Sequence, residues 1–494
     1  MESGEPGPTG PGAPARAGLP QRIVLAGSVA GAAVVALDGT VLTVAQPSLR
    51  GDLGATFPQI QWTGTGYLIA VAGLLVLAGR LGDRYGHRRM FAVGMLGFGA
   101  ASAGIGLAPG VGWVIGLRVV QGVFGALLQP ATLGMLRAAC PPDRLAGAIA
   151  LRTCAIGVAA AAGPVVGGAL TAHFGWRAVF FLNVVPTVVI GVLALAVRMP
   201  DRPGDSRARL DLPGAGLLAA ALICLVHTLV GLPETGWTPG AALGCAGVAV
   251  AAAAFVRHER RTPHPLVPPG LLGRAALGPA LGVLLCASAA LFGTLFVATY
   301  FLQDVLAMDP LESGVRVLPL AVLMVLAAPA AAALSRRWGP RGTAVPAMAL
   351  IALGILVLSP LDRGSQPLVI SGGFLVLGAG FGAVMVTATA VVVRHAPVAR
   401  AGVAGGLQQT AMNIGPVLGV ALAATLLTLA GDGPRDTGPD GTAPYGGGED
   451  AFLSAMGTTL PVLAAVAVLG ALLATRLPGP GTDPSGGSAG TSRS

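Results

Sequence analysis

Long apolar stretches recur along the whole chain, and short segments rich in Gly, Pro and Arg separate them. Stretches of about 20 apolar residues are long enough to cross the ~30 Å hydrocarbon core of a bilayer as helices. We therefore expect an all-α, multi-pass membrane protein. The pattern predicts fourteen spans, at residues 23–46, 59–79, 90–108, 112–136, 147–172, 178–197, 212–232, 240–256, 276–302, 314–334, 343–359, 368–393, 402–430 and 452–475.

The composition supports this class. Only 10% of the 494 residues are charged and 54% are hydrophobic, whereas soluble domains are about 25% charged. Glycine accounts for 76 residues, and small residues let helices approach closely inside a membrane. The chain is therefore suited to a tightly packed helical bundle.

The arginines predict the orientation of the bundle. All 30 basic residues are Arg, and 23 of them fall in the segments on the same side as both termini, against five on the other side. Positive charge concentrates on the cytoplasmic side of membrane proteins. We therefore expect both termini to be cytoplasmic, in the cell membrane. The net charge of +9 thus reports topology, and no nucleic-acid partner is expected.

Three pairs of segments repeat in the same order at a nearly constant offset. LGDRYGHRR (81–89) resembles LSRRWGPRG (334–342), and GPVVGGAL (163–170) resembles GPVLGVAL (415–422). QGVFGALLQPATLGMLR resembles GAGFGAVMVTATAVVVR in the same way. A parallel repeat of two six-helix halves explains this order. The predicted divisions are a disordered cytoplasmic tail (1–20), the N-terminal half (21–199), two inserted helices (200–262), the C-terminal half (263–477) and a second disordered cytoplasmic tail (478–494).

Two charges inside the predicted spans are the first functional candidates. Asp38 is the only ionisable residue in the first span, and Arg118 lies early in the fourth. Charged residues inside membranes are costly and usually functional, and removal from water favours the protonated form of a carboxylate. Asp38 is therefore a candidate proton carrier. The alternatives are a structural hydrogen bond at Asp38 and an arginine that reaches the interface at Arg118.

Two glycine-rich motifs are the next candidates. GRLGDRYGHRR (79–89) is a short loop with one acid among arginines, and its simplest interpretation is an ordinary positive-inside loop. In the fifth span, Pro164 is expected to kink the helix, while Gly163, Gly167 and Gly168 form a smooth face or simply allow close packing. Arg152 lies about one turn inside the same span, near enough to its end to reach the interface.

Together the repeat, the spans and the motifs resemble the major facilitator superfamily, and more narrowly its fourteen-span drug:proton antiporter family. The resemblance rests on GRLGDRYGHRR, LDGTVLTVAQP (37–47), LRVVQGVFGA (117–126) and AAAAGPVVGGAL (159–170). It departs from the family pattern at Thr43, Gln46 and Ala159. The resemblance implies proton-coupled export of small, mostly hydrophobic drugs or antibiotic-like metabolites by alternating access.

The resemblance also implies roles for residues. It assigns proton coupling and substrate binding to Asp38, Arg118 and Thr40, and an export-associated kink to the GPVVGG motif. It assigns a cytoplasmic gate to Gly79, Gly82, Asp83, Arg84, Gly86 and Arg88. Other polar and aromatic residues either line a cavity or satisfy helix contacts, and these are Trp62, Tyr67, Gln121, Gln129, Asn183, Tyr300, Gln303, Gln409 and Asn413.

The partners follow from the same interpretation. We expect a monomer that binds a small molecule, protons and lipid, uses the proton gradient and needs no cofactor or metal. One intramembrane carboxylate favours a neutral or monocationic substrate over a dication. A proton-coupled importer of a small metabolite remains the alternative. A membrane-embedded enzyme is disfavoured, because the sequence contains no HExxH, GxSxG or phosphate-binding motif.

Overall fold

The computed structural model describes residues 19–196, 211–235, 238–263, 265–267, 276–308, 310–397, 400–430 and 448–479. Within these ranges every regular element is a helix, and thirteen helices are long and apolar enough to cross a membrane. The predicted all-α class is therefore confirmed. The two predicted tails lie almost wholly outside the described residues, although the first helix already begins at Leu19.

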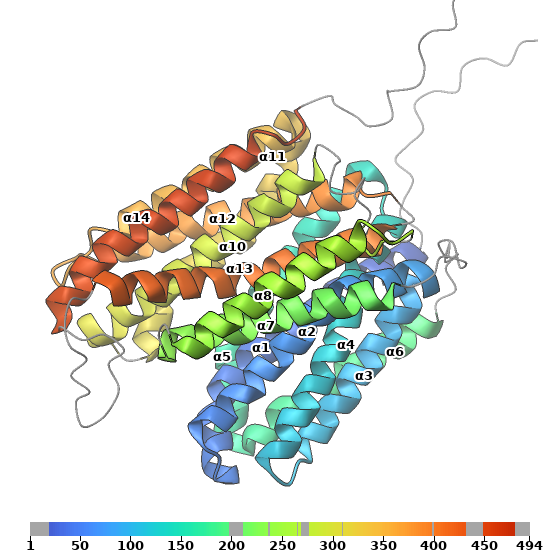
Figure 1. Ribbon diagram of the computed structural model, residues 1–494, viewed down its shortest axis with the longest axis horizontal. Coiled ribbons are helices and arrows are strands. Elements are labelled where there is room, and N and C mark those ends of the chain that lie inside the picture. Colours follow the sequence, from blue (N-terminus) through green and yellow to red (C-terminus); the bar gives the residue numbers. More distant parts are fainter. Residues whose placement is uncertain are drawn as a thin grey trace, which may run out of the picture.

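The first six helices form one bundle, in blue to green in Figure 1. Within it α1 packs on α5 and α6, α2 packs on α4, and α3 packs on α4 and α6. The helices extend beyond most of the predicted spans. Their bounds are α1 (Leu19–Leu53), α2 (Phe57–Tyr85), α3 (His87–Gly106), α4 (Val111–Ala139), α5 (Pro142–Phe174) and α6 (Trp176–Ala196).

The last helices form a second bundle, in yellow to red in Figure 1. Here α10 packs on α12, α13 and α14, and α11 packs on α12 and α14. The bounds are α10 (Leu277–Tyr300), the short π-helix η1 (Phe301–Val305), α11 (Pro310–Leu358), α12 (Pro367–His395), α13 (Ala401–Ala430) and α14 (Gly448–Ala474).

The 49-residue α11 accounts for the difference between thirteen observed spans and fourteen predicted ones. It covers both predicted spans at 314–334 and 343–359. Between them the backbone of Gly339 leaves the helical conformation, with φ 75° and ψ 170°. This is the left-handed region that favours glycine. The long element is therefore two spans joined at a glycine kink.

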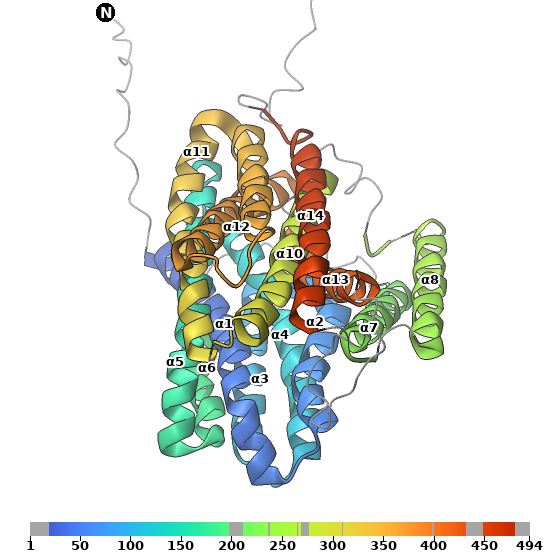
Figure 2. The same cartoon turned by 90° about the vertical axis from the view of Figure 1, so that its left-hand side faces the viewer.

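The two helices between the bundles are α7 (Leu212–Thr235) and α8 (Pro239–Glu259). They pack on each other, and α7 also contacts α2 of the first bundle and α13 of the second. Figure 2 shows α8 at the outer edge of the molecule, beyond α7. The inserted pair therefore lies beside the junction of the bundles and is attached to it through α7.

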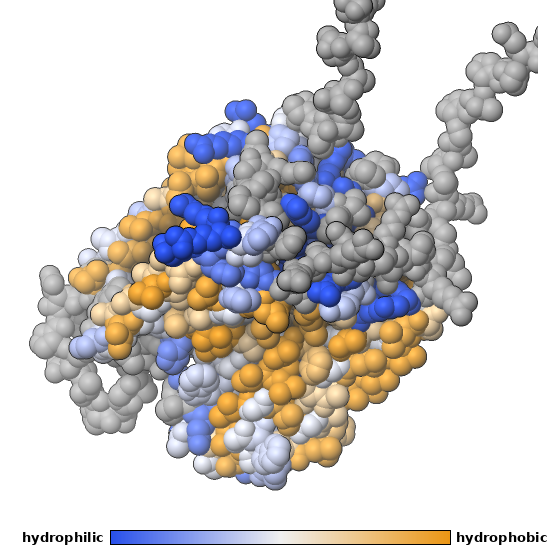
Figure 3. Space-filling view, turned by 45° about the vertical axis from the view of Figure 1, so that its right-hand side comes forward, coloured by the Kyte–Doolittle hydropathy of each residue, from blue (hydrophilic) through white to orange (hydrophobic). Residues whose placement is uncertain are grey.

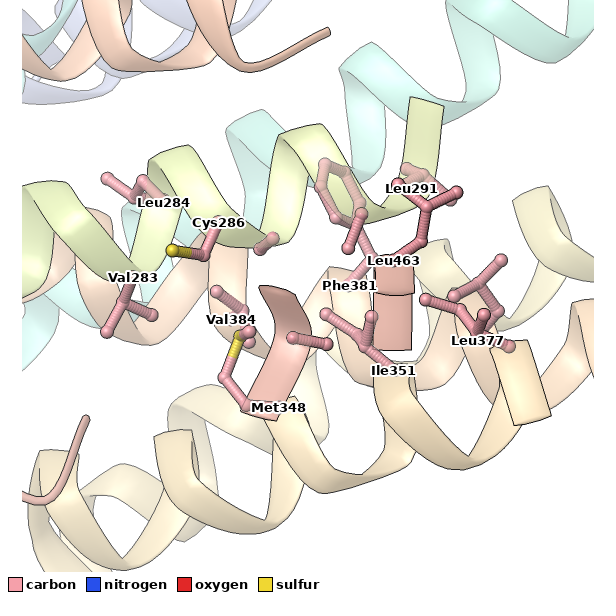
Figure 4. Packing of buried hydrophobic residues seen from close by; sticks show 14 of the residues in the cluster. Val283, Leu284, Cys286, Leu291, Met348, Ile351, Leu377, Phe381, Val384 and Leu463 are labelled. Atoms are coloured by element: carbon pink, nitrogen blue, oxygen red, sulfur yellow. The ribbon is translucent and has the colours of Figure 1, made fainter. Parts of the chain in front are cut away.

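Packing inside each bundle depends on apolar side chains in close contact. Figure 4 shows Met348 and Ile351 of α11 beside Val384 and Phe381 of α12, next to Leu291 of α10. In a bilayer the lipid is as apolar as these side chains, so close van der Waals packing holds the helices together. Figure 3 shows hydrophobic residues over the helix sides and strongly hydrophilic residues gathered towards one end.

The bundles meet along α2, α4 and α5 of the first and α11, α12 and α13 of the second. The backbone of Gly79 closely approaches that of Gly402, and Gly406 packs on Leu75. Farther along α5, Cys154 Sγ contacts the carbonyl oxygen of Val325 on α11 at 3.2 Å. The contact between Gly79 and Gly402 lies at the end of the molecule where α2 and α4 end and α5 and α13 begin. We call it the Asp83 end.

Candidate functional site

Asp38 and Arg118 form an ion pair inside the first bundle. The Arg118 Nη1 on α4 donates to Asp38 Oδ2 on α1 at 2.7 Å. Asp38 is 4% exposed and Arg118 2% exposed. A buried ion pair needs further hydrogen bonds to balance the loss of water, and both residues have them.

Two amides complete the coordination of the Asp38 carboxylate. Asn183 Nδ2 on α6 donates to Asp38 Oδ1 at 2.8 Å, and Gln121 Nε2 on α4 donates to the same oxygen at 3.1 Å. Gln121 also donates to Ser102 Oγ on α3 at 2.7 Å. One carboxylate thus joins α1, α4 and α6, and a shared amide extends the network to α3.

Arg118 has its own set of acceptors. Its Nε donates to the Thr63 carbonyl on α2 at 2.9 Å, and its Nη1 also donates to Gln121 Oε1 at 2.5 Å. The guanidinium lies 4.5 Å from the ring centre of Tyr67, in a cation–π arrangement. The alternative in which Arg118 reaches the interface is therefore wrong, because its side chain points into the bundle.

The GPVVGG motif packs against α1 next to Asp38. A Cβ at Gly163 would overlap the Thr40 side chain, and one at Gly167 would come within 2.9 Å of Val41. The Thr40 hydroxyl donates back to carbonyl oxygens of its own helix. The motif thus holds α5 against the turn of α1 that follows Asp38. The side chain of Pro164 lies outside the described part of the chain, and the helix α5 continues through this position.

Asp83 connects the two bundles at the Asp83 end. Its Oδ1 accepts from the Gly402 amide at 2.6 Å, and its Oδ2 accepts from the Val403 amide at 3.1 Å. These amides belong to the first turn of α13, where unsatisfied N–H groups and the helix dipole attract a negative charge. His87 Nε2 lies 3.3 Å from the same carboxylate. The carboxylate therefore joins α2 to the start of α13.

The other predicted gate residues have different environments. Gly86 links α2 to α3 with φ 95°, which requires a glycine. Gly79 allows the close approach to Gly402, and Gly82 leaves room for the His87 ring. Arg88 donates to the carbonyls of Ala194 and Leu195 on α6. The Arg84 guanidinium lies over the Tyr85 ring. Neither of these arginine contacts reaches the second bundle.

The remaining predicted cavity residues fall into three groups. Gln129 on α4 and Gln409 on α13 bond to each other across the two bundles, Gln409 Nε2 donating at 2.5 Å, and Asn413 donates to the Gln409 carbonyl. Trp62 instead faces α7, with its ring 5.8 Å from that of His227. Tyr300 packs on Phe296, and Gln303 lies half-buried in η1.

Several site residues were not predicted from the sequence. Ser102 and Thr63 complete the Asp38–Arg118 network, and the Gly402 amide receives Asp83. Small polar residues and backbone groups give no distinctive signal in an apolar span. In the described part of the chain, no group of His, Cys, Asp or Glu residues could hold a metal ion.

An unpredicted cluster attaches the inserted helices at the Asp83 end. The Arg80 guanidinium donates to the carbonyls of Pro265 and Leu266. Glu259, at the end of α8, accepts from the amides of Leu266 and Val267 at 2.8 and 3.0 Å. The segment after α8 is therefore held from one side by α2 and from the other by α8.

Sequence comparison gives a consistent result over most of the chain. The family profile described as Major Facilitator Superfamily matches residues 29–420. The tetracenomycin C resistance and export protein of Streptomyces glaucescens is 38% identical over 92% of this chain and 91% of its own length. The puromycin resistance protein of Streptomyces alboniger is 35% identical over 80% of both chains. The multidrug efflux pump LfrA of Mycolicibacterium smegmatis is 31% identical over 80% of this chain and 78% of its own.

Comparison with solved structures supports the same architecture. The human organic anion transporter MFSD10 aligns with a TM-score of 0.67, covering 92% of this chain and 100% of that one at 15% identity. The proton:xylose symporter XylE aligns with a TM-score of 0.63, covering 93% and 96% at 15% identity. At this identity the likeness concerns the fold.

Proposed function

The chain belongs to the Major Facilitator Superfamily, and from this premise we propose that it is a proton-coupled exporter of small, mostly hydrophobic drugs or antibiotic-like compounds. It acts as a monomer in the bacterial cell membrane, with both termini in the cytoplasm. The relatives named above support this proposal, because their names describe export, resistance or efflux. Membership of a transporter superfamily also separates the chain from the membrane-embedded enzyme considered at the outset.

The buried Asp38–Arg118 pair is the observation that carries the proposal. It places a carboxylate and a guanidinium inside a membrane bundle, on α1 and α4, and hydrogen bonds join the pair to α2 and α6. A proton on Asp38 removes the attraction to Arg118 and turns one carboxylate oxygen into a donor. The network must then rearrange. Proton binding is thereby linked to the packing of α1, which is what a proton-driven conformational change requires.

The packing of α5 on α1 gives this rearrangement a route to the second bundle. Gly163 and Gly167 seat α5 against Thr40 and Val41, and α5 in turn contacts α11 and α12. A shift of α1 is therefore transmitted through a helix that lies between the two bundles. In alternating access, one bundle rocks against the other around a central site.

The contacts at the Asp83 end support assignment of this conformation to an outward-facing state. Asp83 holds the first turn of α13, and the Gln129–Gln409 bond closes the interface further in. If this end is cytoplasmic, as the arginine distribution predicts, the pathway is shut on the inside. Protonation of Asp38 from outside would then precede the change to the inward-facing state.

Import is the alternative, and the direction of movement separates it from export. The likeness to a proton:xylose symporter carries no weight here, because it concerns the fold alone. The relatives with export in their names are far more similar in sequence. We therefore retain export as the proposal.

The test is movement of ethidium in liposomes with an imposed pH gradient. Wild type should move the dye against the proton flow, and Asp38→Asn should lose at least about tenfold of the gradient-driven rate. Arg50→Gln, at the exposed end of α1, is the control and should behave like wild type. Movement of dye in the direction of proton flow would support import. Equal gradient-driven rates in Asp38→Asn and wild type would remove Asp38 from the coupling mechanism.

A further inference from the structure

Arg152 is a second buried arginine of the first bundle, and the mechanism above does not use it. It is 3% exposed and lies ten residues after Pro142, the first residue of α5. At 1.5 Å per residue this is about 15 Å along the helix. The sequence-based expectation that Arg152 reaches the interface is therefore wrong, because its side chain is enclosed deep in the bundle.

Among the residues that the structure describes, none forms a hydrogen bond or an ion pair with the Arg152 side chain, and its Nε is fully covered. Arg118, buried to the same degree, has a carboxylate, an amide and a carbonyl as acceptors. Buried polar groups are nearly always paired, so an enclosed guanidinium without an acceptor implies that something else supplies one.

Arg152 lies next to a cluster of apolar side chains between the two bundles, on the side of the cluster away from the Asp83 end. Leu145 and Ile149 of α5 cluster with Leu133 of α4 and Val393 of α12. Arg152 follows Ile149 by three residues, so it lies on the same face one turn farther from the Asp83 end.

Two amides lie at the same depth. Gln129 precedes Leu133 by one turn of α4, and it bonds to Gln409 of the second bundle. Arg152, Gln129 and Gln409 therefore form a polar layer directly behind the apolar contact. When the bundles separate at the Asp83 end, a molecule that passes the apolar contact from that side meets these polar side chains.

We infer that this layer is a recognition site for the acidic group of an amphipathic substrate, with Arg152 as the residue that binds a carboxylate, phenolate or enolate. The inference rests on the proposed export function, since only a transported molecule reaches the layer. It changes the expected substrate from a neutral or monocationic molecule to one with an apolar body and one acidic group.

The chemistry of the layer selects for an acid. A guanidinium is planar, stays charged when buried and presents paired donors that match a carboxylate. Asp38 is too distant to be the acceptor for Arg152. Thr40, two residues after Asp38, packs on Gly163 of α5, and Gly163 lies eleven residues beyond Arg152, or about 16 Å along the helix. The two glutamines add neutral donors beside the guanidinium. Leu133 and Leu145, on the side towards the Asp83 end, accommodate the apolar body.

Equilibrium binding of two matched probes to the purified full chain tests the inference. Pyrenebutyrate and pyrenebutanol share one apolar body and differ in the acidic group. Energy transfer from the tryptophans to pyrene reports binding. Wild type should bind the acid about tenfold more tightly than the alcohol. Arg152→Met should lose this preference by weakening the acid alone, and Arg152→Lys should keep part of it. Arg144→Met, on the exposed start of α5, should match wild type.

The inference is overturned if wild type binds neither probe or shows no preference, or if Arg152→Met weakens both probes equally. The last result would mean that Arg152 only supports the fold, and thermal unfolding of each variant checks this separately. Gradient-driven movement of pyrenebutyrate, beside that of ethidium, in the same liposomes is an independent test of export. Absence of the acid preference from wild type with either compound still moved rejects the site alone, whereas an intact preference with neither compound moved rejects the transport function alone.

Discussion

Arg118 depends on Asp38 for its charge partner, since no other carboxylate contacts it within the described residues. Removing one member of a buried pair leaves an uncompensated charge, which costs about 3–5 kcal/mol. We predict that Asp38→Asn lowers the free energy of unfolding by about this amount. Chemical denaturation of the purified protein measures it.

A double-mutant cycle separates the pair from its surroundings. Asp38→Asn with Arg118→Gln removes both charges, so the double variant should be more stable than the sum of the two single losses predicts. Additive losses would show that the two side chains do not stabilise each other.

Asp52 offers a contrasting carboxylate at the exposed end of α1. Trp176 Nε1 donates to it at 2.9 Å, and Arg177 Nη1 at 2.5 Å. These hydrogen bonds, the Trp176 one foremost, hold the pKa of Asp52 below its usual value. A lowered pKa stabilises the fold above the ordinary carboxyl range, and this stabilisation is lost only as the pH falls through the lowered pKa.

Asp52 therefore stays charged across the pH range of transport assays, about pH 5 to 8. We predict that Asp52→Asn leaves the shape of the pH–rate profile unchanged in this range. Initial transport rates at several external pH values measure it. A displaced profile would show that Asp52 titrates during transport.

At the residue scale, the sequence identifies the important charged residues more readily than the residues that form hydrogen bonds with them. Asp38 and Arg118 are conspicuous because each interrupts an apolar span. Asn183 and Gln121 were expected either to line a cavity or to satisfy a helix contact, and in this conformation both donate to Asp38. Their assignment needs three-dimensional proximity, since Asn183 lies 145 residues from Asp38. Arg152 shows the limit most clearly, because no feature of the sequence indicates that it is buried without a hydrogen-bond partner among the described residues.

The contact between α1 and α5 depends on glycine at specific positions. A Cβ at Gly163 would overlap Thr40, whereas the nearest atom to a Cβ at Gly168 is Val44 Cγ1 at 3.9 Å. Forcing an extra methyl group into a packed interface costs about 1–3 kcal/mol. We predict that Gly163→Ala lowers both stability and transport, while Gly168→Ala, in the same motif, is tolerated. Thermal unfolding and ethidium transport measure the two effects, and equal behaviour of the two variants would contradict this account.

The contact between Asp83 and α13 is expected to hold the Asp83 end closed. A charge at a helix N-terminus contributes about 0.3–1 kcal/mol, and up to about 2 when partly buried. Asp83→Asn should therefore shift the population several-fold towards a conformation open at this end. Distances between spin labels at Arg89 and Arg400, which are both exposed, measure the shift.

Arg84→Gln is the matched control for this experiment. It removes a neighbouring charge that lies over the Tyr85 ring, so its distance distribution should match that of wild type. A specific role for the Asp83 carboxylate would be contradicted if Arg84→Gln lengthened the distance relative to wild type, or if Asp83→Asn left it unchanged.

The helices themselves were largely predictable, because each needs about 20 apolar residues and charged or glycine-rich loops separate them. Joining of two spans into α11 was not predicted, since the loop between them is short and helical on both sides of Gly339. The partner of Asp83 was also hidden. It is a pair of backbone amides 319 and 320 residues away, and backbone groups leave no mark in a sequence.

At the scale of the molecule, α7 contacts both bundles, and it packs more extensively on α2 of the first than on α13 of the second. A Cβ at Gly73 of α2 would lie 3.4 Å from Ile223 of α7. We predict that α7 moves with the first bundle. A disulfide between Gly73→Cys and Ile223→Cys, in a background without the native cysteines, should therefore leave transport largely intact.

A second disulfide provides the comparison. Leu133→Cys on α4 and Gly405→Cys on α13 would link the two bundles, because a Cβ at Gly405 would lie 3.5 Å from Leu133 Cβ, close enough for a disulfide. Oxidation should therefore stop transport, and reduction should restore it. Transport that survives this second disulfide would contradict rocking of one bundle against the other. The inserted helices show that the arrangement of the whole molecule cannot be predicted from the sequence alone. Their presence was predictable, but their attachment through Arg80 and Glu259 was not.

The central claim is that Asp38 takes up and releases the coupling proton. Infrared difference spectra of the purified protein, recorded as the pH is lowered across the range in which it transports, test this most directly and need no knowledge of the substrate. The account predicts a carboxylic-acid band that grows in wild type and is absent from Asp38→Asn. Identical spectra from the two proteins would show that Asp38 keeps one protonation state, and the proposed coupling mechanism would then be wrong.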